Sequence, residues 1–372
     1  MKNCTGIINS GAQNRSYGLL SKTRPDYMLP FGGRYRIIDF SLSNMSNYRL
    51  SHVMLYAGSN IRSTLDHIGD GKSWELNRRT KGLMINPPSF DDISGENSEI
   101  MTYFDSLPFY EYTTTDHIYI ENPMALAKIN LKEVYDAFVE HNYDVLLVYA
   151  TVEDPLGAYL NMNKLILDSN GSLVNVGINL GTQDVVHLYL SKMFIKKKVF
   201  IDIVKDSIEK GNARTMIQAV MNNKSRLKIG TCQVNCHIEM IRDLVSYYRA
   251  NMALLDPDIY NELFHTGGMV YTKSKDEPST LYKEGARVSN SLVANGCIIE
   301  GQVENSIIFR GVRVHKNAIV RNSILIQKTQ VEEGAVLINT ISDKYSTVRA
   351  NVSLVGSPVN PFVIAKNQII ER

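Results

Sequence analysis

The chain is poor in cysteine, in tryptophan and in net charge. Its 372 residues include four cysteines and one tryptophan, and its formal net charge is +2 at pH 7. Four cysteines are few for a disulfide framework in a chain this long, so we expect buried free thiols. Cys232, Cys236 and His237 lie close together in the sequence, but no second Cys/His pair completes a tetrahedral set, so we expect no metal. A net charge this small gives no case for binding nucleic acid.

Long apolar runs are also missing. No segment approaches the roughly 20 apolar residues that cross a membrane. Met1 and Lys2 lead directly into a strand-like stretch without the features of a signal peptide. With 44% hydrophobic and 21% charged residues, the composition is typical of a globular protein. We therefore expect a cytoplasmic protein with no membrane partner.

What the chain does contain is a repeat in about its last ninety residues. An asparagine, a serine or threonine and an aliphatic residue recur at spacings of fifteen, seventeen and seventeen residues, starting at Asn290, Asn305, Asn322 and Asn339. Between these phrases, aliphatic or small residues lie six apart. This hexapeptide pattern is typical of a triangular left-handed β-helix with asparagines at the coil corners. Such coils must stack on neighbours, so we expect partner contacts on the sides and ends of the column.

The preceding residues alternate apolar runs with amphipathic stretches, which predicts a mostly parallel sheet covered by helices. Strands are expected at 5–9, 52–56, 117–121, 145–150 and 187–190, and helices at 39–46, 60–66, 131–141, 198–210 and 243–255. An Asn-Gly pair within 168–171 predicts a hairpin with a type I′ turn. We therefore divide the chain into an α/β domain at 1–255, a linker at 256–280 and the β-helix at 281–372.

The loop after the first strand is where doubly wound folds bind their ligands. A phosphate-binding loop needs several glycines and a cation. This loop contains one glycine, Gly11, and one cation, Arg15. Its sequence is Gly11, Ala12, Gln13, Asn14, Arg15 and Ser16. Alone, it is a weak signal for nucleotide binding.

The segment 30–44 reads PFGGRYRIIDFSLSN and contains Phe31, Gly32, Gly33 and Arg34. It resembles the signature of the ADP-glucose pyrophosphorylases (glucose-1-phosphate adenylyltransferases) of bacterial glycogen synthesis. The resemblance extends along the whole chain, through the YYRAN sequence at 247–251 to the C-terminal repeat. It implies a GT-A-like nucleotidyltransferase domain with a Rossmann-like mixed sheet, followed by a left-handed β-helix. A tight turn before a helix would also explain the paired glycines, and the two explanations are compatible.

Where the chain departs from this family, the catalytic parts are missing. The family's two metal-binding aspartates fall on Met124 and Met240, and a thioether has no affinity for Mg²⁺. Two cationic positions near the nucleotide phosphates fall on Ser16 and Asp26. The glucose-phosphate motif falls near 176–180, where no lysine occurs. The resemblance therefore implies a nucleotidyltransferase-like domain with a degenerate site and no metal.

The Asp-His-Ile-Tyr sequence at 116–119 is similar to one of the family's two motifs that contain a metal-binding aspartate. Asp116 precedes the expected strand at 117–121, whereas the family's aspartate follows a strand, so we expect Asp116 to be a solvated turn residue. If it were a ligand, the chain would be an active or weakly active adenylyltransferase, and this alternative stays open. A hexapeptide acyltransferase is a remote alternative, because such sites usually offer a histidine base and the repeat contains only His315.

The joint loss of catalytic parts resembles the GlgD-type branch of the family. This resemblance implies a regulatory, catalytically inactive subunit without a cofactor of its own, since Mg²⁺ would be needed only by an active partner. It also implies a hetero-oligomer, expected to be a tetramer, in which the chain activates a catalytic subunit. Arg24 and Arg36 match two of four cationic positions of the family's activator site, so a sugar-phosphate effector is expected there. Pairing of these arginines with local carboxylates is the equally weighted alternative.

Overall fold

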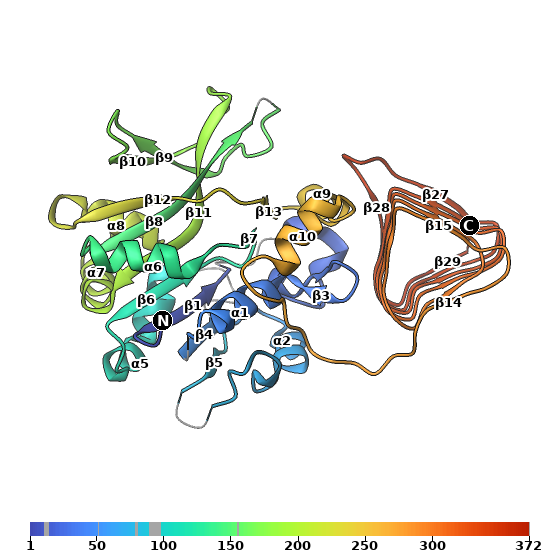
Figure 1. Cartoon of the computed structure of the whole chain (residues 1–372), viewed down its shortest axis with the longest axis horizontal. Helices are drawn as coiled ribbons and strands as arrows, with labels where there is room; N and C mark the ends of the chain where they lie inside the picture. Colours follow the sequence, from blue (N-terminus) through green and yellow to red (C-terminus); the bar gives the residue numbers. More distant parts are fainter. Residues whose placement is uncertain (11–14, 51, 79–80, 89–97, 155, 372) are drawn as a thin grey trace. The chain divides into compact units, whose positions relative to one another are not determined.

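The computed structural model describes residues 1–10, 15–50, 52–78, 81–88, 98–154 and 156–371 (Figure 1). The chain forms two compact units, and neither is continuous in sequence. Unit 1 contains Met1–Gln13, Phe40–Met240 and Gly267–Met269, and unit 2 contains Asn14–Asp39, Ile241–Thr266 and Val270–Arg372. This grouping differs from the division predicted above, because the segment Asn14–Asp39 belongs to the same unit as the repeat.

Unit 1 is built on a mixed nine-stranded sheet, as the sequence predicts. Its main path runs β10-β9-β11-β6-β1-β4-β5, and β8 joins β11 to β12. β1 pairs in parallel with β4 and β6, whereas β11 is antiparallel to β6 and β8. The strands are β1 (Cys4–Asn9), β4 (His52–Tyr56), β5 (Leu83–Asn86), β6 (His117–Glu121), β8 (Val145–Glu153), β9 (Asn163–Leu167), β10 (Leu173–Ile178), β11 (Val185–Lys196) and β12 (Ile229–Gln233). The carboxyl ends of β1 and β6 therefore lie on one edge of the sheet, where ligands bind in such folds.

Helices cover this sheet (Figure 1). Among the described residues up to 222, the α-helices are α1 (Ile37–Asn47), α2 (Ile61–Ile68), α4 (Glu99–Asp105), α5 (Leu107–Tyr112), α6 (Leu131–Glu140), α7 (Lys197–Lys210) and α8 (Met216–Asn222). The five predicted helices are present, with α9 (Leu244–Ala253) as the last of them. In the described part of the chain, no helix is long and apolar enough to cross a membrane. The main core combines strand residues with buried side chains of α4, α5, α7 and α8.

Two local expectations need correction. The hairpin of β9 and β10 is present, but its turn is not type I′, because Gly171 (φ 77°) has a positive φ and Asn170 does not. The Asp168 carboxylate instead accepts from the backbone N–H groups of Asn170 and Ser172 and fixes a longer turn. The predicted linker also contains a helix, α10 (Pro257–His265), whose first turn is capped by Asp256. Proline suits the first helical position because its missing N–H would have no partner there.

The C-terminal repeat forms the predicted left-handed β-helix, with the triangular section visible in Figure 1. Its three parallel sheets contain six, five and five strands. Asn290, Asn305, Asn322 and Asn339 occupy the corners at φ values of 39°, 47°, 48° and 49°. Asparagine is favoured there because it tolerates the left-handed conformation. The strands are β14 (Leu281–Tyr282), β15 (Arg287–Ser289), β16 (Leu292–Val293), β17 (Ile298–Ile299), β18 (Gln302–Glu304), β19 (Ile307–Ile308), β20 (Arg313–Val314), β21 (Ile319–Arg321), β22 (Ile324–Leu325), β23 (Gln330–Val331), β24 (Val336–Ile338), β25 (Thr340–Ser342), β26 (Thr347–Val348), β27 (Ser353–Val355), β28 (Phe362–Ile364) and β29 (Ile369–Ile370).

The residue after each corner asparagine links successive coils from inside. The Ser306 hydroxyl accepts from the Ser323 N–H at 3.0 Å, and the Ser323 hydroxyl accepts from the Thr340 N–H at 3.1 Å. All three side chains are fully buried. These stacked hydroxyl groups accept hydrogen bonds from backbone N–H groups at the corners, which would otherwise be left unpaired. It explains why serine or threonine recurs in the sequence repeat.

Candidate functional site

Met124 and Met240, on which the sequence resemblance places the family's metal-binding aspartates, lie on neighbouring segments of unit 1. Met124 directly precedes β7 (Ala125–Ala127), and Met240 ends β13 (Ile238–Met240). These strands pair antiparallel, with Met240 opposite Ala125. Both methionines are buried, at 9% and 8% exposure. The fold therefore forms the pair of positions that a two-aspartate site needs, but the side chains are apolar.

The carboxylates close to these strands each have a basic partner, although Glu121 uses only one of its two oxygens for it. Glu121, at the end of β6, forms an ion pair with Lys192, and Glu239 Oε1 lies 3.1 Å from His237 Nε2. Mg²⁺ favours carboxylate oxygens that remain free to coordinate it. Within the described ranges, no group of three or more His, Cys, Asp or Glu side chains could hold a metal ion. These residues do not fit the divalent cation that nucleotidyl transfer uses.

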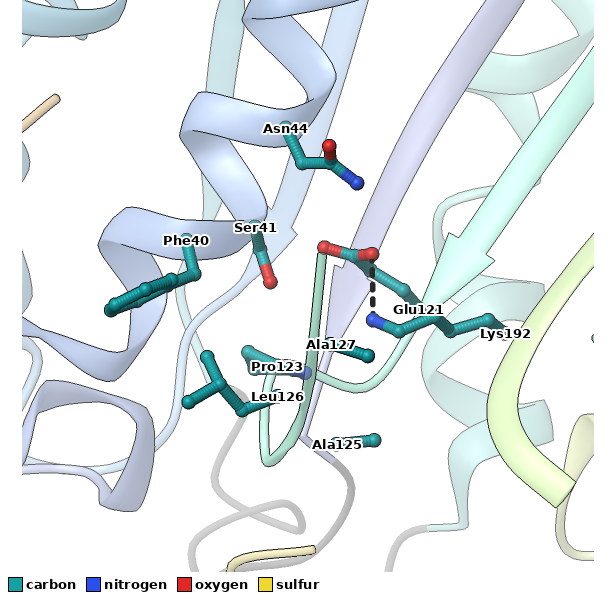
Figure 2. Close-up of a pocket in the computed structure, with 9 residues that line it drawn as sticks. All are labelled: Phe40, Ser41, Asn44, Glu121, Pro123, Ala125, Leu126, Ala127 and Lys192. Atoms are coloured by element: carbon teal, nitrogen blue, oxygen red, sulfur yellow. Dashed lines mark hydrogen bonds and ion pairs between the residues drawn. The ribbon is translucent and has the colours of Figure 1, made fainter. Parts of the chain in front are cut away.

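A small polar pocket lies beside this segment. Figure 2 shows Ser41 and Asn44 of α1 on one side, Glu121 and Lys192 on the other, and Pro123 with the β7 residues below. Lys192 Nζ donates to Glu121 Oε2 at 3.0 Å, and the Tyr119 hydroxyl donates to the same oxygen at 2.7 Å. Burial and the Glu121 charge together hold the pKa of Tyr119 well above its usual value. The Glu121 carboxylate is therefore fixed by two donors on one of its oxygens.

The nucleotide loop can be placed only in part. Gly11, Ala12, Gln13 and Asn14 lie outside the described residues, and Arg15 and Ser16 begin a 3₁₀ helix, η1 (Arg15–Ser21), in unit 2. Downstream of this loop, Asp26 is 6% exposed. Burial, together with the charge of Asp26, raises the pKa of Tyr17. Asp26, on which the resemblance places a cation of the family, is therefore a buried carboxylate.

The segment that matches the glucose-phosphate motif has a structural role. Asn179 follows β10, is fully buried, and donates to Asp154 Oδ2 at 3.3 Å and to the Tyr159 carbonyl at 3.1 Å. Asp154 in turn accepts from the N–H groups of Ala158 and Tyr159. These bonds fix a loop within unit 1. The side chains that could have met a sugar phosphate hold the local backbone instead.

Asp116 lies at the opposite end of β6 from Glu121, as predicted. It is exposed and accepts a hydrogen bond from Asn3 Nδ2 at 3.1 Å. Because it precedes the strand, it is a turn residue on the amino-terminal edge of the sheet. Asp116 therefore does not contribute to the carboxyl edge.

The family signature forms a tight hairpin in unit 2. β2 (Pro30–Phe31) and β3 (Tyr35–Arg36) pair across Gly32 and Gly33, whose φ values of 58° and 82° favour glycine. A Cβ on Gly32 would also lie 3.0 Å from Phe264 Cζ. Phe31 is fully buried, while Arg34 is exposed.

Hydrogen bonds tie this hairpin to the rest of unit 2. Gly32 N–H donates to Asn251 Oδ1 at 3.1 Å, and the Tyr247 hydroxyl donates to the Pro30 carbonyl at 2.6 Å. From the β-helix, Arg310 Nη2 donates to the Arg34 carbonyl at 2.9 Å. The signature is thus a structural junction between α9 and the first coils.

The two effector candidates belong to a cluster of basic side chains in unit 2. Arg24 is 3% exposed, and its Nη2 contacts Asp343 Oδ2 at 2.8 Å, so its partner is a carboxylate far away in the sequence and not the local one that the alternative expected. Its Nη1 is buried without a hydrogen-bond partner among the described residues. Arg36 Nη1 donates to the Met28 carbonyl at 3.3 Å. One nitrogen of the Arg24 guanidinium is therefore not satisfied by the described part of the protein.

Two lysines of this cluster were not anticipated from the sequence. Burial, followed by the charges of Arg36 and Arg24, lowers the pKa of Lys344 to about 6. Lys275 is an exposed residue, and partial burial of its side chain followed by the charge of Arg310 lowers its pKa as well. No local pattern could identify either lysine, because the fold alone brings them to Arg24 and Arg36. We call Arg24, Arg36, Lys275 and Lys344 the basic cluster.

Comparison with known proteins agrees with this architecture. Residues 279–359 match the model of the family described as GlmU-like, C-terminal hexapeptide. The chain is 32% identical to the glycogen biosynthesis protein GlgD of Bacillus subtilis over 365 residues, covering 98% of this chain and 96% of that protein. It is 31% identical to GlgD of Geobacillus stearothermophilus, covering 85% and 82%, and 27% identical to glucose-1-phosphate adenylyltransferase of Clostridium beijerinckii, covering 85% and 82%. The chain therefore belongs to the glucose-1-phosphate adenylyltransferase family, among its GlgD glycogen biosynthesis proteins.

Proposed function

We propose that this chain is a regulatory, catalytically inactive subunit in glycogen biosynthesis. In this proposal it resides in the cytoplasm and forms a hetero-oligomer with a catalytic glucose-1-phosphate adenylyltransferase, which makes ADP-glucose and diphosphate from ATP and glucose 1-phosphate. The observation that carries the proposal is the juxtaposition of Met124 and Met240 across β7 and β13. If these are the two positions of the family's metal centre, as the resemblance implies, both side chains are thioethers that do not bind Mg²⁺.

The remaining carboxylates do not offer a substitute. Glu121 is held by Lys192 and Tyr119, and recruiting it to a metal would leave the Lys192 ammonium buried without its partner. Breaking a buried pair in this way is strongly unfavourable. The alternative of an active adenylyltransferase would therefore need ligands from elsewhere, and Asp116 lies at the wrong end of β6. The acyltransferase alternative rests on His315 alone, without a cluster of catalytic groups around it in the described coils.

The test compares three preparations under one set of conditions. The purified chain alone, the catalytic homologue from the same source and an equimolar mixture are assayed for ADP-glucose formation with ATP, glucose 1-phosphate and Mg²⁺. We expect background activity from the chain alone, co-elution of the two proteins, and a higher rate for the mixture than for the homologue. Serum albumin replaces the chain as a control for nonspecific stabilisation. Mg²⁺-dependent turnover by the chain alone would support the active alternative, and failure to associate would contradict the regulatory function.

We also propose that the basic cluster binds the phosphate group of a sugar-phosphate effector. Four basic side chains converge there, and the charges of Arg36, Arg24 and Lys275 all disfavour the charged form of Lys344, so an anion would relieve this repulsion. The buried Nη1 of Arg24 without a partner is the feature that favours an incoming anion. Arginine suits this task because its planar group donates two parallel hydrogen bonds to phosphate oxygens.

Calorimetric titration with inorganic phosphate tests this site. Arg36→Met is expected to weaken binding at least tenfold, because it removes one of the converging charges. Arg287→Met serves as the matched control, since Arg287 is an exposed residue of the first coil and does not act on Lys344. Equal losses in the two variants would indicate a general charge effect and contradict a specific site.

A further inference from the structure

The pocket in Figure 2 contains polar atoms that the protein itself does not satisfy. Glu121 is 1% exposed and Asn44 is 3% exposed. Among the described residues, Glu121 Oε1 has no hydrogen-bond partner, and neither Nδ2 nor Oδ1 of Asn44 has one. Buried polar groups are almost always hydrogen-bonded, to protein or to ordered water. Three such atoms in one pocket therefore call for a partner that lies outside the chain.

The pocket has the size of one small polar molecule. Its volume is about 10 Å³, which is close to the lower limit for holding one water molecule. Figure 2 shows the Glu121 oxygen that is not bonded to Lys192 facing Ser41 and Asn44. A water molecule can donate two hydrogen bonds and accept two, so it can donate to Glu121 Oε1 and accept from Asn44 Nδ2 at the same time. The unsatisfied atoms are two acceptors, Glu121 Oε1 and Asn44 Oδ1, and one donor, Asn44 Nδ2, which one water molecule has enough donors and acceptors to bond.

The charges favour a neutral occupant. The Glu121 carboxylate is already balanced by the Lys192 ammonium at 3.0 Å. A sodium, potassium or ammonium ion in the pocket would bring a second positive charge beside Lys192 in a poorly hydrated place, which is unfavourable. The apolar wall formed by Phe40, Pro123 and Leu126 offers no further carboxylate to balance it.

We propose that this pocket is a binding site for a single water molecule that bridges Asn44 of α1 to Glu121 at the end of β6. The water completes a chain of hydrogen bonds from Asn44 through Glu121 to Lys192 on β11. It thereby holds the segment between β6 and β7, which carries Met124, against α1. The inference concerns how unit 1 is held together and stands independently of the regulatory function proposed above.

A crystal structure at about 1.5 Å resolution tests the site directly. We expect one fully occupied density peak within hydrogen-bond distance of both Glu121 Oε1 and Asn44 Nδ2. Crystals soaked in rubidium chloride test for a cation, because rubidium gives an anomalous signal. An anomalous peak in the pocket, a direct bond between Asn44 and Glu121, or an empty pocket would each overturn the proposal.

Hydrogen exchange gives a second measurement that does not depend on crystals. Asn44→Leu keeps the branched shape and the number of heavy atoms but removes the polar amide atoms, so the water loses its partner on α1. We expect amide exchange in segment 122–127 to accelerate at least tenfold, while α7, which does not line the pocket, serves as the internal control. Unchanged exchange in segment 122–127 would contradict the bridging role. If the variant fails to fold, the density in the wild-type crystal still decides whether the water is present.

Discussion

The buried ion pair of Arg24 and Asp343 gives the sharpest test of how unit 2 is held together. The two side chains are 3% and 0% exposed, and Arg24 Nη2 lies 2.9 and 2.8 Å from the two Asp343 oxygens. Asp343 Oδ1 also accepts from the Lys344 N–H at 2.7 Å. The pair joins the segment before the signature hairpin to the coil that follows β25. Asp343→Asn removes the negative charge that pairs with Arg24. We predict that it lowers the free energy of unfolding.

The expected loss follows from the burial of the guanidinium. Removing one partner of a buried pair costs about 3–5 kcal/mol. The asparagine oxygen can still accept one hydrogen bond from Arg24, so we expect the lower end, about 3 kcal/mol, which is roughly a hundredfold in the unfolding equilibrium. Natural domains are stable by only about 5–15 kcal/mol. A large fraction of the free energy of unfolding therefore depends on this carboxylate.

Urea denaturation followed by circular dichroism measures the effect. The midpoint should fall while the slope stays the same, because the area exposed on unfolding does not change. Asp136→Asn is the matched control, since its pair with Lys132 is exposed on α6 and such pairs contribute at most about 0.5 kcal/mol. The double variant Arg24→Met/Asp343→Leu should recover much of the loss, because it removes both charges together. A loss below about 1 kcal/mol for Asp343→Asn would refute the reasoning.

Three further predictions concern other parts of the chain. Sulfate serves as a probe of the basic cluster because its own charge does not change near neutral pH. An anion favours the charged form of Lys344, whose pKa is about 6. Sulfate binding should therefore take up a proton, and the affinity should fall up to tenfold per pH unit above pH 6. Calorimetry should show this dependence in the wild type but not in Lys344→Met, and an unchanged affinity between pH 6.5 and 8 would contradict it. In the β-helix, Asn322→Ala should lower the free energy of unfolding by about 1–2 kcal/mol, because the corner has φ 48°, whereas Asn322→Gly should lower it less. Equal losses in urea denaturation would argue against the corner explanation. Lys192→Met should lower the free energy of unfolding by about 3–5 kcal/mol, because it leaves the Glu121 charge buried without its basic partner. If Glu121→Gln in the same chain restores the stability, the unpaired charge is the cause.

The pKa of Lys344 also predicts how stability changes with pH. The unfolded chain keeps a proton on this lysine up to about pH 10.5, whereas the folded protein releases it near pH 6. Between these values the unfolded state binds more protons, so this group makes the folded state more stable as pH rises, and its contribution is constant below pH 6. Stability curves of the wild type and Lys344→Met should therefore converge as pH rises, and parallel curves would contradict the low pKa.

Much of the fold could be predicted because its signals are local. The strands His52–Tyr56 and His117–Glu121 have the predicted bounds, since apolar runs bounded by polar residues identify strands without further context. β11 was predicted at 187–190 but extends over Val185–Lys196. The pairing with β8 shifts register between Tyr189 and Lys192, and Ser191 adopts φ 52°. The bulge lets the strand continue, and no residue type in the sequence signals it.

The candidate site shows the same division between local and long-range information. The sequence resemblance selects Met124 and Met240, and in the structure Met240 pairs with Ala125, the residue that follows Met124. It could also select Arg24 and Arg36, while Lys275 and Lys344 were missed. The ion pairs that involve Glu121 and Arg24 were missed as well. Each joins residues far apart in the chain, so no local spacing predicts it.

The sequence by itself determined the β-helix, because each coil repeats the same physical requirement. Every turn needs a residue that tolerates a positive φ, a hydroxyl that bonds to the next coil and an aliphatic side chain in the core, and all three lie within a few residues of one another. The tertiary structure alone decided that segment Asn14–Asp39 belongs with these coils and that Asp343 balances Arg24. Burial strengthens the attraction between charges by excluding water, and burial depends on the packing of the whole unit.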